Sequence, residues 1–318
     1  MSRAFIAVLC LALAACGGAQ ARRDWYLSQG QQYMAASDFE QARIAFHNAL
    51  YIDPANTRIR VLTAEAAERS GKLREAAQLY KRAIDRDPRQ LHARARLGRL
   101  YALAGDIDKA LATIEPGLAA APDDPDLRAV RGVVRLRKGD EKGAYEDAAH
   151  AVKIAPANEN AVALLAALNR RSAHTGKAIA IVRRALRAKP HSVDLHLILA
   201  QLLLAAGRQP DAEAQVQEVV QLEPGRLAFR DRLAQLLDTH GWNMLQEGEA
   251  AEAAATLQQA VDNAPQSPTL RYHLGMAQLE TGERAAAREN LRLAVESGTG
   301  FAGFQDARST LENLTHSR

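Results

Sequence analysis

The residues best suited to chemistry are few, and none completes a catalytic or metal-binding motif. His191 and His196 stand five residues apart, but no further metal ligand is found at a suitable spacing, so we interpret them as solvated surface. Gly298, Gly300 and Gly303 match the phosphate-binding pattern G-x-G-x-x-G, which requires a preceding strand. Because their context is helical, we expect a flexible link instead. The sequence predicts a non-enzyme with no metal, no cofactor and no small-molecule substrate.

The elements that must position any functional side chain repeat along the chain. A proline recurs every 34 residues, and an alanine keeps the same spacing. Each proline cannot continue the helix before it, and each alanine allows two helices to approach closely. The pattern predicts a stack of short helical units, marked by Pro54, Pro88, Pro122, Pro156, Pro190 and Pro224 and by Ala42, Ala76, Ala110, Ala144, Ala178 and Ala212.

Residues 23–56 show one unit in full. Trp25 and Tyr26 begin a helix that includes Gly30 and Tyr33, a turn follows at 37–39, and Ala42, Phe46 and Ala49 share one face of a second helix before Pro54. This order resembles the tetratricopeptide repeat (TPR). The resemblance implies an all-α, right-handed superhelical TPR solenoid of about eight helix-turn-helix repeats, closed by a C-terminal capping helix.

The 34-residue spacing is interrupted once. Six repeats occupy 23–226, but the next proline of this kind, Pro265, comes 41 residues after Pro224, an excess of seven. Two displaced repeats therefore occupy 227–300, and 227–233 lengthens the first of their helices. We predict one long helix at about 227–246, with Gly241 as the place for any bend. An apolar stripe after Gly300 predicts the capping helix and tail at 301–318.

The N-terminus resembles a bacterial lipoprotein signal. Phe5 begins an apolar run of 11 residues, too short to span a bilayer, which ends in Leu-Ala-Ala-Cys. The resemblance implies a signal peptide at 1–15, a lipid on Cys16 and a lipidated linker at 16–22. In this kind of signal, Asp directly after the cysteine favours retention at the inner membrane. Because Gly17 stands there instead, we expect an outer-membrane anchor facing the periplasm. Cleavage after Ala19-Gln20-Ala21 would instead release a soluble periplasmic protein.

Charge and cysteine content narrow the class of partner. The chain has 41 Lys and Arg against 37 Asp and Glu, an excess too small to indicate nucleic-acid binding. Of its two cysteines, Cys10 lies within the predicted signal peptide, so no disulfide framework is expected. The partners we expect are proteins or peptides of the cell envelope, with membrane contact through the lipid anchor.

The TPR resemblance also implies where a partner binds. In this family the first helix of each repeat lines a groove, and here those positions combine arginines with aliphatic residues. We expect the groove to take an extended or helical peptide with acidic groups beside apolar anchors. The predicted groove residues are His92, Arg96 and Arg99; Val130, Val133, Leu136 and Arg137; Leu164, Arg170 and Arg171; and Leu197, Ile198, Gln201 and Leu204. The alternative is that the arginines are only solvated and that the aliphatic residues pack against neighbouring helices.

The displaced repeats predict a second, aromatic groove formed by Trp242, Tyr272, His273 and Met276. Aromatic residues dominate many binding surfaces. Alternatively, Trp242 fills the space that the seven inserted residues create.

The segment Asp238–Trp242, followed by Leu245–Gly248, resembles TPR lipoproteins that accompany exopolysaccharide production and the PEP-CTERM sorting system in Gram-negative bacteria. The resemblance implies a membrane-tethered scaffold for protein–protein interactions in envelope assembly. One alternative is an adaptor for pilus, outer-membrane or peptidoglycan-enzyme complexes. Another is a regulatory subunit of an envelope enzyme.

Overall fold

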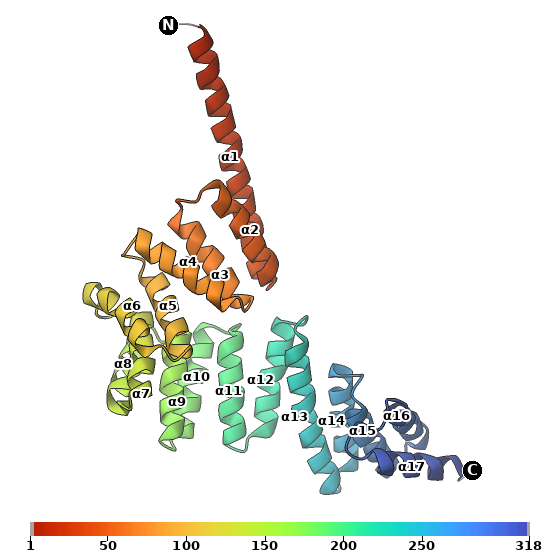
Figure 1. Cartoon of the computed structure of the whole chain (residues 1–318). Helices are drawn as coiled ribbons and strands as arrows, with labels where there is room; N and C mark the ends of the chain where they lie inside the picture. Colours follow the sequence, from red (N-terminus) through yellow and green to blue (C-terminus); the bar gives the residue numbers. More distant parts are fainter. Residues whose placement is uncertain (1–2, 317–318) are drawn as a thin grey trace. The chain divides into compact units, whose positions relative to one another are not determined.

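The computed structural model describes the backbone of residues 3–316 and the side chains of residues 18–316. Within that part of the chain it consists of helices and turns, without a strand (Figure 1). The helices pair in sequence order, which confirms the predicted all-helical fold. They are α1 (Arg3–Ala35), α2 (Phe39–Ile52), α3 (Thr57–Arg69), α4 (Leu73–Arg86), α5 (Leu91–Leu103), α6 (Ile107–Ala120), α7 (Pro125–Arg137), α8 (Glu141–Ile154), α9 (Glu159–Arg171), α10 (Thr175–Ala188), α11 (Val193–Ala205), α12 (Gln209–Leu222), α13 (Leu227–Gln246), α14 (Ala250–Asn263), α15 (Pro268–Glu280), α16 (Arg284–Glu296) and α17 (Phe304–His316).

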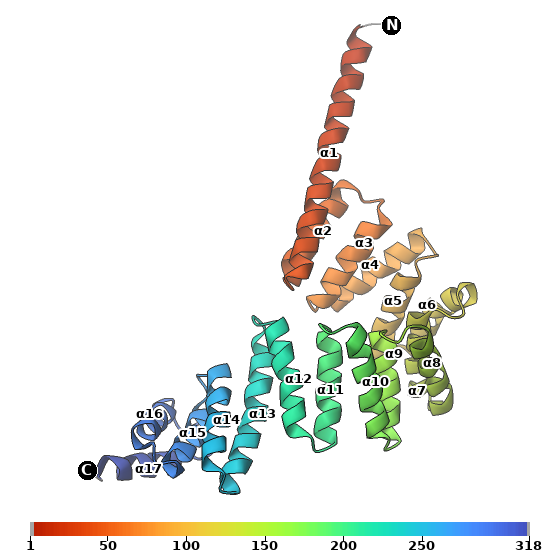
Figure 2. The ribbon, with the colours of Figure 1, turned by 180° about the vertical axis from the view of Figure 1, so that it is seen from behind.

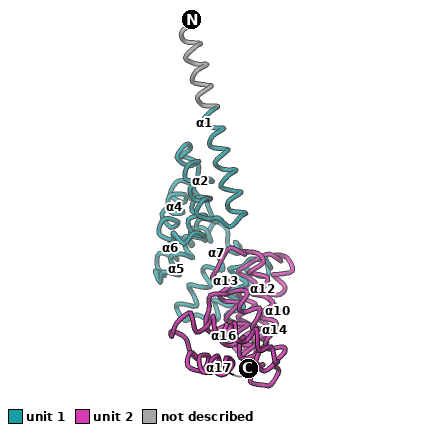
Figure 3. The backbone as a smooth tube through the Cα atoms, turned by 90° about the vertical axis from the view of Figure 1, so that its right-hand side faces the viewer, with its two compact units in different colours: residues 1–168 teal, residues 169–318 magenta. Residues whose placement is uncertain are grey.

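The chain divides into two compact units, residues 1–168 and residues 169–318 (Figure 3). In the first unit, each helix from α1 to α8 packs on the next one in sequence. In the second, α10 to α17 do the same, and Figure 2 shows this succession from behind. Helix α5 also contacts α7, and α13 contacts α15, in each case between adjacent repeats. Each unit is therefore a stack in which these contacts stay within a repeat or join adjacent repeats, as a repeat architecture requires.

The predicted signal peptide at 1–15 and the predicted lipid attachment at Cys16 lie outside the residues whose side chains are described. Within the described residues, no helix has both the length and the apolarity needed to cross a membrane.

The fourth repeat shows how the sequence sets the ends of its helices. Asp124 caps α7 by accepting a hydrogen bond from the Leu127 amide at 2.9 Å, and a proline follows it at the first helical position. Gly139 then turns the chain with φ of 86°, a left-handed conformation that favours glycine. Asp140 caps α8 by accepting from the Gly143 amide at 2.8 Å. Each boundary thus has a local chemical cause.

Small residues hold the paired helices close together, as predicted. The six recurring alanines are all fully buried: Ala42, Ala76, Ala110, Ala144, Ala178 and Ala212. Opposite them, a Cβ added at Gly30 would lie 2.4 Å from the Phe46 ring, and one at Gly98 would lie 2.5 Å from the Ile114 side chain. A larger residue at these positions would overpack the contact.

A polar contact that the sequence analysis did not identify recurs at the repeat junctions. Six residues after a recurring proline, a basic side chain donates a hydrogen bond back to the proline carbonyl. This carbonyl follows a helix end and would otherwise need water, so the bond fixes the entry of the next helix. The bonds join Arg94 to Pro88 (2.9 Å), Arg128 to Pro122 (2.7 Å), His196 to Pro190 (2.8 Å) and Arg271 to Pro265 (2.9 Å).

The lengthened helix and the capping helix are both present. Helix α13 runs from Leu227 to Gln246, so the seven inserted residues extend its N-terminal part as predicted. Gly241 serves a close contact, because a Cβ there would lie 2.7 Å from Leu257 of α14. Helix α17 packs on α16 and buries Ala307 completely.

Candidate protein-docking surfaces

The basic residues predicted on α5 already have partners within the protein. Arg96 Nη2 lies 2.9 Å from Glu68 Oε2, and Arg99 contacts the other carboxylate oxygen. The Glu68 side chain is 5% exposed, and it also accepts a hydrogen bond of 3.0 Å from the Tyr80 hydroxyl. Both arginines are therefore counter-ions of a buried carboxylate that the sequence analysis did not single out.

His92 makes a similar contact at the edge of this surface. Its Nε2 lies 2.7 Å from Glu65 Oε1 on α3, and this hydrogen bond raises the pKa of His92. The side chain is about half exposed, at 51%. His92 thus remains accessible, with its charge partly balanced by Glu65.

Two of the predicted groove residues are core residues, which corrects that part of the prediction. Val130 is 3% exposed and belongs to a cluster with Ile114 and Leu127. Leu164 is 5% exposed, and its side chain fills the space above Gly132, where a Cβ would be 2.6 Å away. Their side chains pack between helices and are not available to a ligand.

The other predicted residues of repeats four and five lie nearer the surface. Val133 is half-buried against Ala102 and Val134, whereas Arg137 is exposed at the end of α7. Arg170 and Arg171 are exposed at the end of α9. Neither of the two pockets described below has any of these predicted residues in its lining.

Three of the four residues predicted in repeat six line a pocket; Ile198 does not. Leu197 and Gln201 of α11 form one wall, and the cavity volume is about 120 Å³. Dry apolar cavities of roughly 150 Å³ can hold a benzene molecule, so this pocket is about the size of one apolar side chain. The remaining lining residues are Ala200 and Leu204 of α11, Val216 of α12, and Arg232 and Leu236 of α13.

Polar groups stand beside the apolar part of this pocket. Gln201 and Arg232 are both exposed, and no described residue forms an ion pair with Arg232. A guanidinium beside an aliphatic pocket can bind a carboxylate while an apolar side chain enters the pocket. Arg232 belongs to the inserted segment 227–233, so the interruption of the spacing was the sequence signal that could have identified it.

The predicted aromatic groove is largely occupied by the protein itself. Trp242 stacks on His273 with ring centroids 4.1 Å apart, and Tyr272 lies 6.0 Å from Trp242. Tyr272 is 7% exposed and donates a hydrogen bond of 2.5 Å to Asp306 on the capping helix α17. The prediction is therefore corrected for Tyr272, which is a core residue covered by α17.

The rest of this aromatic cluster is half-buried. Trp242 and Met276 pack against the same core as Phe301 and Leu311, and His273 Nδ1 lies 2.6 Å from Asp238 Oδ1. Trp242 therefore packs inside the second unit, against the last repeat and the capping helix. None of these contacts is with the inserted residues 227–233, so the alternative that Trp242 fills the space they create stays a prediction.

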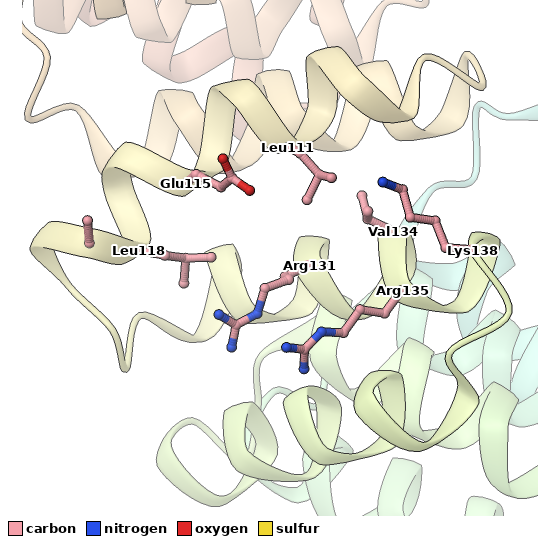
Figure 4. A pocket seen from close by; sticks show the side chains of 8 residues that line it. Leu111, Glu115, Leu118, Arg131, Val134, Arg135 and Lys138 are labelled. Carbon is pink, nitrogen blue, oxygen red and sulfur yellow. The ribbon is translucent and has the colours of Figure 1, made fainter.

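A larger pocket opens between α6 and α7 (Figure 4). Its volume is about 520 Å³, and its lining residues are Leu111, Glu115, Leu118, Ala119, Arg131, Val134, Arg135 and Lys138. Arg131 and Arg135 are held at 2.6 and 2.9 Å by Asp147, whose side chain is 1% exposed. The hydrogen bond from Arg131 to Asp147 raises the pKa of Arg131. Neither the pocket nor the role of Asp147 was predicted from the sequence.

The motifs considered for metal or phosphate chemistry have structural roles in the described part of the chain. His196 is buried, which corrects its interpretation as a solvated surface residue, and its ring nitrogens lie near Pro190 O and Gln215 Oε1; His191 is exposed as expected. No group of three His, Cys, Asp or Glu side chains suited to a metal is found among residues 18–316. Gly303 has φ of 91°, and a Cβ there would lie 2.4 Å from the Tyr272 ring. Gly303 therefore makes a close contact, whereas a Cβ on Gly298 or Gly300 would meet nothing within 4 Å.

Comparison with known protein families gives one consistent result. One model of the tetratricopeptide repeat matches residues 67–133, 170–237 and 244–314, and a second matches residues 27–90. Among curated proteins, none matches.

Solved structures resemble this chain in fold. A chain of the APC/C hetero-tetramer Cut9–Hcn1 is 14% identical with a TM-score of 0.54; the match covers 95% of this chain and 58% of that one. A human IFIT1 dimer with PPP-AAAA is 15% identical, also with a TM-score of 0.54, over 86% of this chain and 72% of that one. This chain thus spans little more than half the length of the first of these. At such identity the likeness concerns the fold alone.

Proposed function

Because the chain belongs to the tetratricopeptide-repeat family, we propose that it is a membrane-tethered scaffold that docks partner proteins during assembly of the cell envelope. Stacked repeats of this kind present extended helical surfaces to other proteins. The exopolysaccharide or protein-sorting role rests on the resemblance of the segment from Asp238 to Gly248. Pilus, outer-membrane and peptidoglycan adaptors are the competing roles.

The pocket of repeat six is the observation that supports docking most directly. Its lining combines Leu197, Leu204 and Leu236 with Gln201 and Arg232 beside them. Burying one leucine-sized side chain in such a site is worth about 1.5–3 kcal/mol. The neighbouring guanidinium selects, by charge, a segment that carries an acidic residue near its apolar anchor.

The tether is supported by the sequence of the N-terminus. The apolar run ends at Leu13-Ala14-Ala15-Cys16, and Gly17 favours the outer membrane. A lipid on Cys16 would hold the chain at the membrane with its repeats in the periplasm.

Photo-crosslinking tests the docking site. A photoreactive amino acid replaces Gln201 beside the pocket, and a matched variant carries it at Gln259, an exposed glutamine of α14. We expect a discrete crosslinked protein from position 201 in intact cells and none from position 259. Equal products at both positions, or none at either, would reject this site.

Labelling with palmitate tests the tether. We expect label on the wild-type chain and none on Cys16→Ala. Label on both chains, or on neither, contradicts the lipid anchor; a soluble periplasmic chain with its new N-terminus at Arg22 would show cleavage at the second site.

A further inference from the structure

The chain has one strongly basic segment, and only Arg170 and Arg171 of its cations belong to the predicted groove. Between Glu159 and Asp194 there is no acidic residue. Removing the seven cations of this segment from the 41 Lys and Arg of the chain leaves 34, against 37 Asp and Glu. The positive charge of the whole protein is therefore concentrated here, in Arg170, Arg171, Lys177, Arg183, Arg184, Arg187 and Lys189.

Helix α10 carries four of these cations on its exposed side. Ala178, Ile179, Val182 and Ala185 form its buried face. In contrast, the side chains of Lys177, Arg183, Arg184 and Arg187 are all exposed. We call these four residues the α10 basic face. At 1.5 Å per residue, it extends along about 15 Å of the helix.

The α10 basic face has no counter-ions of its own. None of its four side chains makes an ion pair or hydrogen bond with any described residue. Some arginines elsewhere have counter-ions: Arg292 lies 2.7 Å from Glu289, and the half-buried Arg43 lies 2.6 Å from Glu40. Cations near the end of a helix are favoured by its dipole, but Lys177 stands in the first turn, where they are disfavoured. Helix stability therefore does not explain the whole set.

We propose that the α10 basic face docks an acidic segment of a partner protein, with glutamates or aspartates spaced one helical turn apart. Arg183 and Arg187 are one turn apart, so two carboxylates at i and i+4 of a partner helix can face them. Three of the four cations are arginines, whose planar guanidinium binds carboxylates in a bidentate manner. The exposed small residues Gly176, Ala180 and Ala188 let another backbone approach closely.

The composition of α10 disfavours other anionic partners. The helix has no aromatic residue on which nucleic-acid bases could stack. Its exposed side also has no large apolar side chain to enter a lipid surface. The α10 basic face shares no residue with the pocket of repeat six. An experiment can therefore contradict one of the two proposed docking sites without contradicting the other.

Binding of a defined probe tests the proposal. The probe is a labelled helical peptide with glutamate pairs at i and i+4, added to the full chain and followed by fluorescence anisotropy. We expect binding that weakens steeply with salt, and a loss of about tenfold in the variant Arg183→Glu with Arg187→Glu. The matched control is Arg284→Glu with Arg288→Glu on α16, which has the same spacing, exposure and charge change; it should bind within about twofold of wild type.

Three outcomes would overturn the proposal. They are absence of peptide binding, an equal loss in both double variants, and tighter binding of phosphatidylglycerol vesicles or a single-stranded oligonucleotide than of the peptide. Because all four side chains are exposed, the variants should fold, which circular dichroism will check. Arg183→Gln with Arg187→Gln provides a second variant without charge reversal, and it should also weaken peptide binding.

Discussion

Arg96 lies 2.9 Å from Glu68, whose carboxylate is almost fully buried and also accepts a hydrogen bond from Tyr80. The second carboxylate oxygen contacts Arg99. An arginine that neutralises a buried carboxylate contributes to folding first and to binding second, because removing it leaves an uncompensated charge. A charge-reversal variant at Arg96 would therefore lose stability, and a loss of partner binding in that variant would not by itself show that Arg96 contacts the partner.

Arg96→Glu should therefore destabilise the protein, whereas reversing the charge of a solvated arginine would cost little stability. Losing one partner of a buried ion pair costs about 3–5 kcal/mol; here we expect about 2–3 kcal/mol, because Arg99 remains beside Glu68. Urea denaturation of the full chain measures the effect. The control is Arg137→Glu, at an exposed arginine of α7, which should change the midpoint little. Equal midpoints in the two variants would show that Glu68 does not depend on Arg96.

The spacing of the repeats carried most of what the sequence could predict. The positions of proline, glycine and alanine reflect backbone constraints that act locally, so the helices, the long α13 and the capping helix followed from them. Arg60, which donates to the Pro54 carbonyl in the same way, recurs with Arg94 and Arg128 every 34 residues, and this spacing could have revealed the bond to the proline carbonyl.

Ala173→Gly should stabilise the protein. Ala173 occupies the turn position that glycine holds in neighbouring repeats, and its φ is 60°. The left-handed conformation costs an alanine about 1–2 kcal/mol, part of which is offset by the greater freedom of glycine in the unfolded chain. We expect a net gain of about 1 kcal/mol, or about 2–4 °C in Tm. Gly139→Ala is the reciprocal change and should lower Tm. A change of Tm in the same direction in both variants would contradict the argument.

Ala144→Leu should destabilise the first unit. Ala144 is fully buried on α8, and its carbonyl oxygen lies 3.2 Å from where a Cβ on Gly132 would be. Overpacking at such a contact costs about 1–3 kcal/mol. Thermal denaturation measures the loss, with Ala255→Leu at an exposed site of α14 as the control. An unchanged Tm for Ala144→Leu would mean that the two helices can separate without cost.

The errors in the predicted sites have a common physical cause. Val130, Leu164 and Tyr272 occupy first-helix positions, but whether such a side chain faces a groove depends on which neighbour covers it. Leu164 fills the space above Gly132, and α17 covers Tyr272. These contacts join residues distant in sequence, as does the Arg96–Glu68 pair, so a single repeat pattern does not reveal them.

Gly303→Ala should detach the capping helix from the second unit. A Cβ on Gly303 would lie 2.4 Å from the Tyr272 ring, and the φ of 91° is unfavourable for alanine. We expect faster proteolysis of α17 and altered fluorescence of Trp242, which packs on Tyr272, in a chain whose Trp25 is replaced by Phe. Gly300→Ala has open space at its Cβ and is the control. Wild-type proteolysis and fluorescence in Gly303→Ala would contradict this role.

Glu213 should make the stability of the second unit depend on pH. Burial raises the pKa of Glu213 above its ordinary value of 4.5, even though His240 Nδ1 lies 3.1 Å away, and its Oε1 has no hydrogen-bond partner among the described residues. The folded chain therefore keeps this proton at pH values where the unfolded chain has lost it. Consequently, the free energy of unfolding falls as the pH rises from 4.5 through the raised pKa.

Glu213→Gln removes this titration and should make the protein more stable than wild type at neutral pH. The advantage should disappear below about pH 4.5, where Glu213 is protonated in both the folded and the unfolded chain. Urea denaturation across this pH range measures the difference, with Glu218→Gln, at an exposed position of α12, as the control. A variant less stable than wild type at neutral pH would instead show that the contact with His240 outweighs the cost of burying the carboxylate.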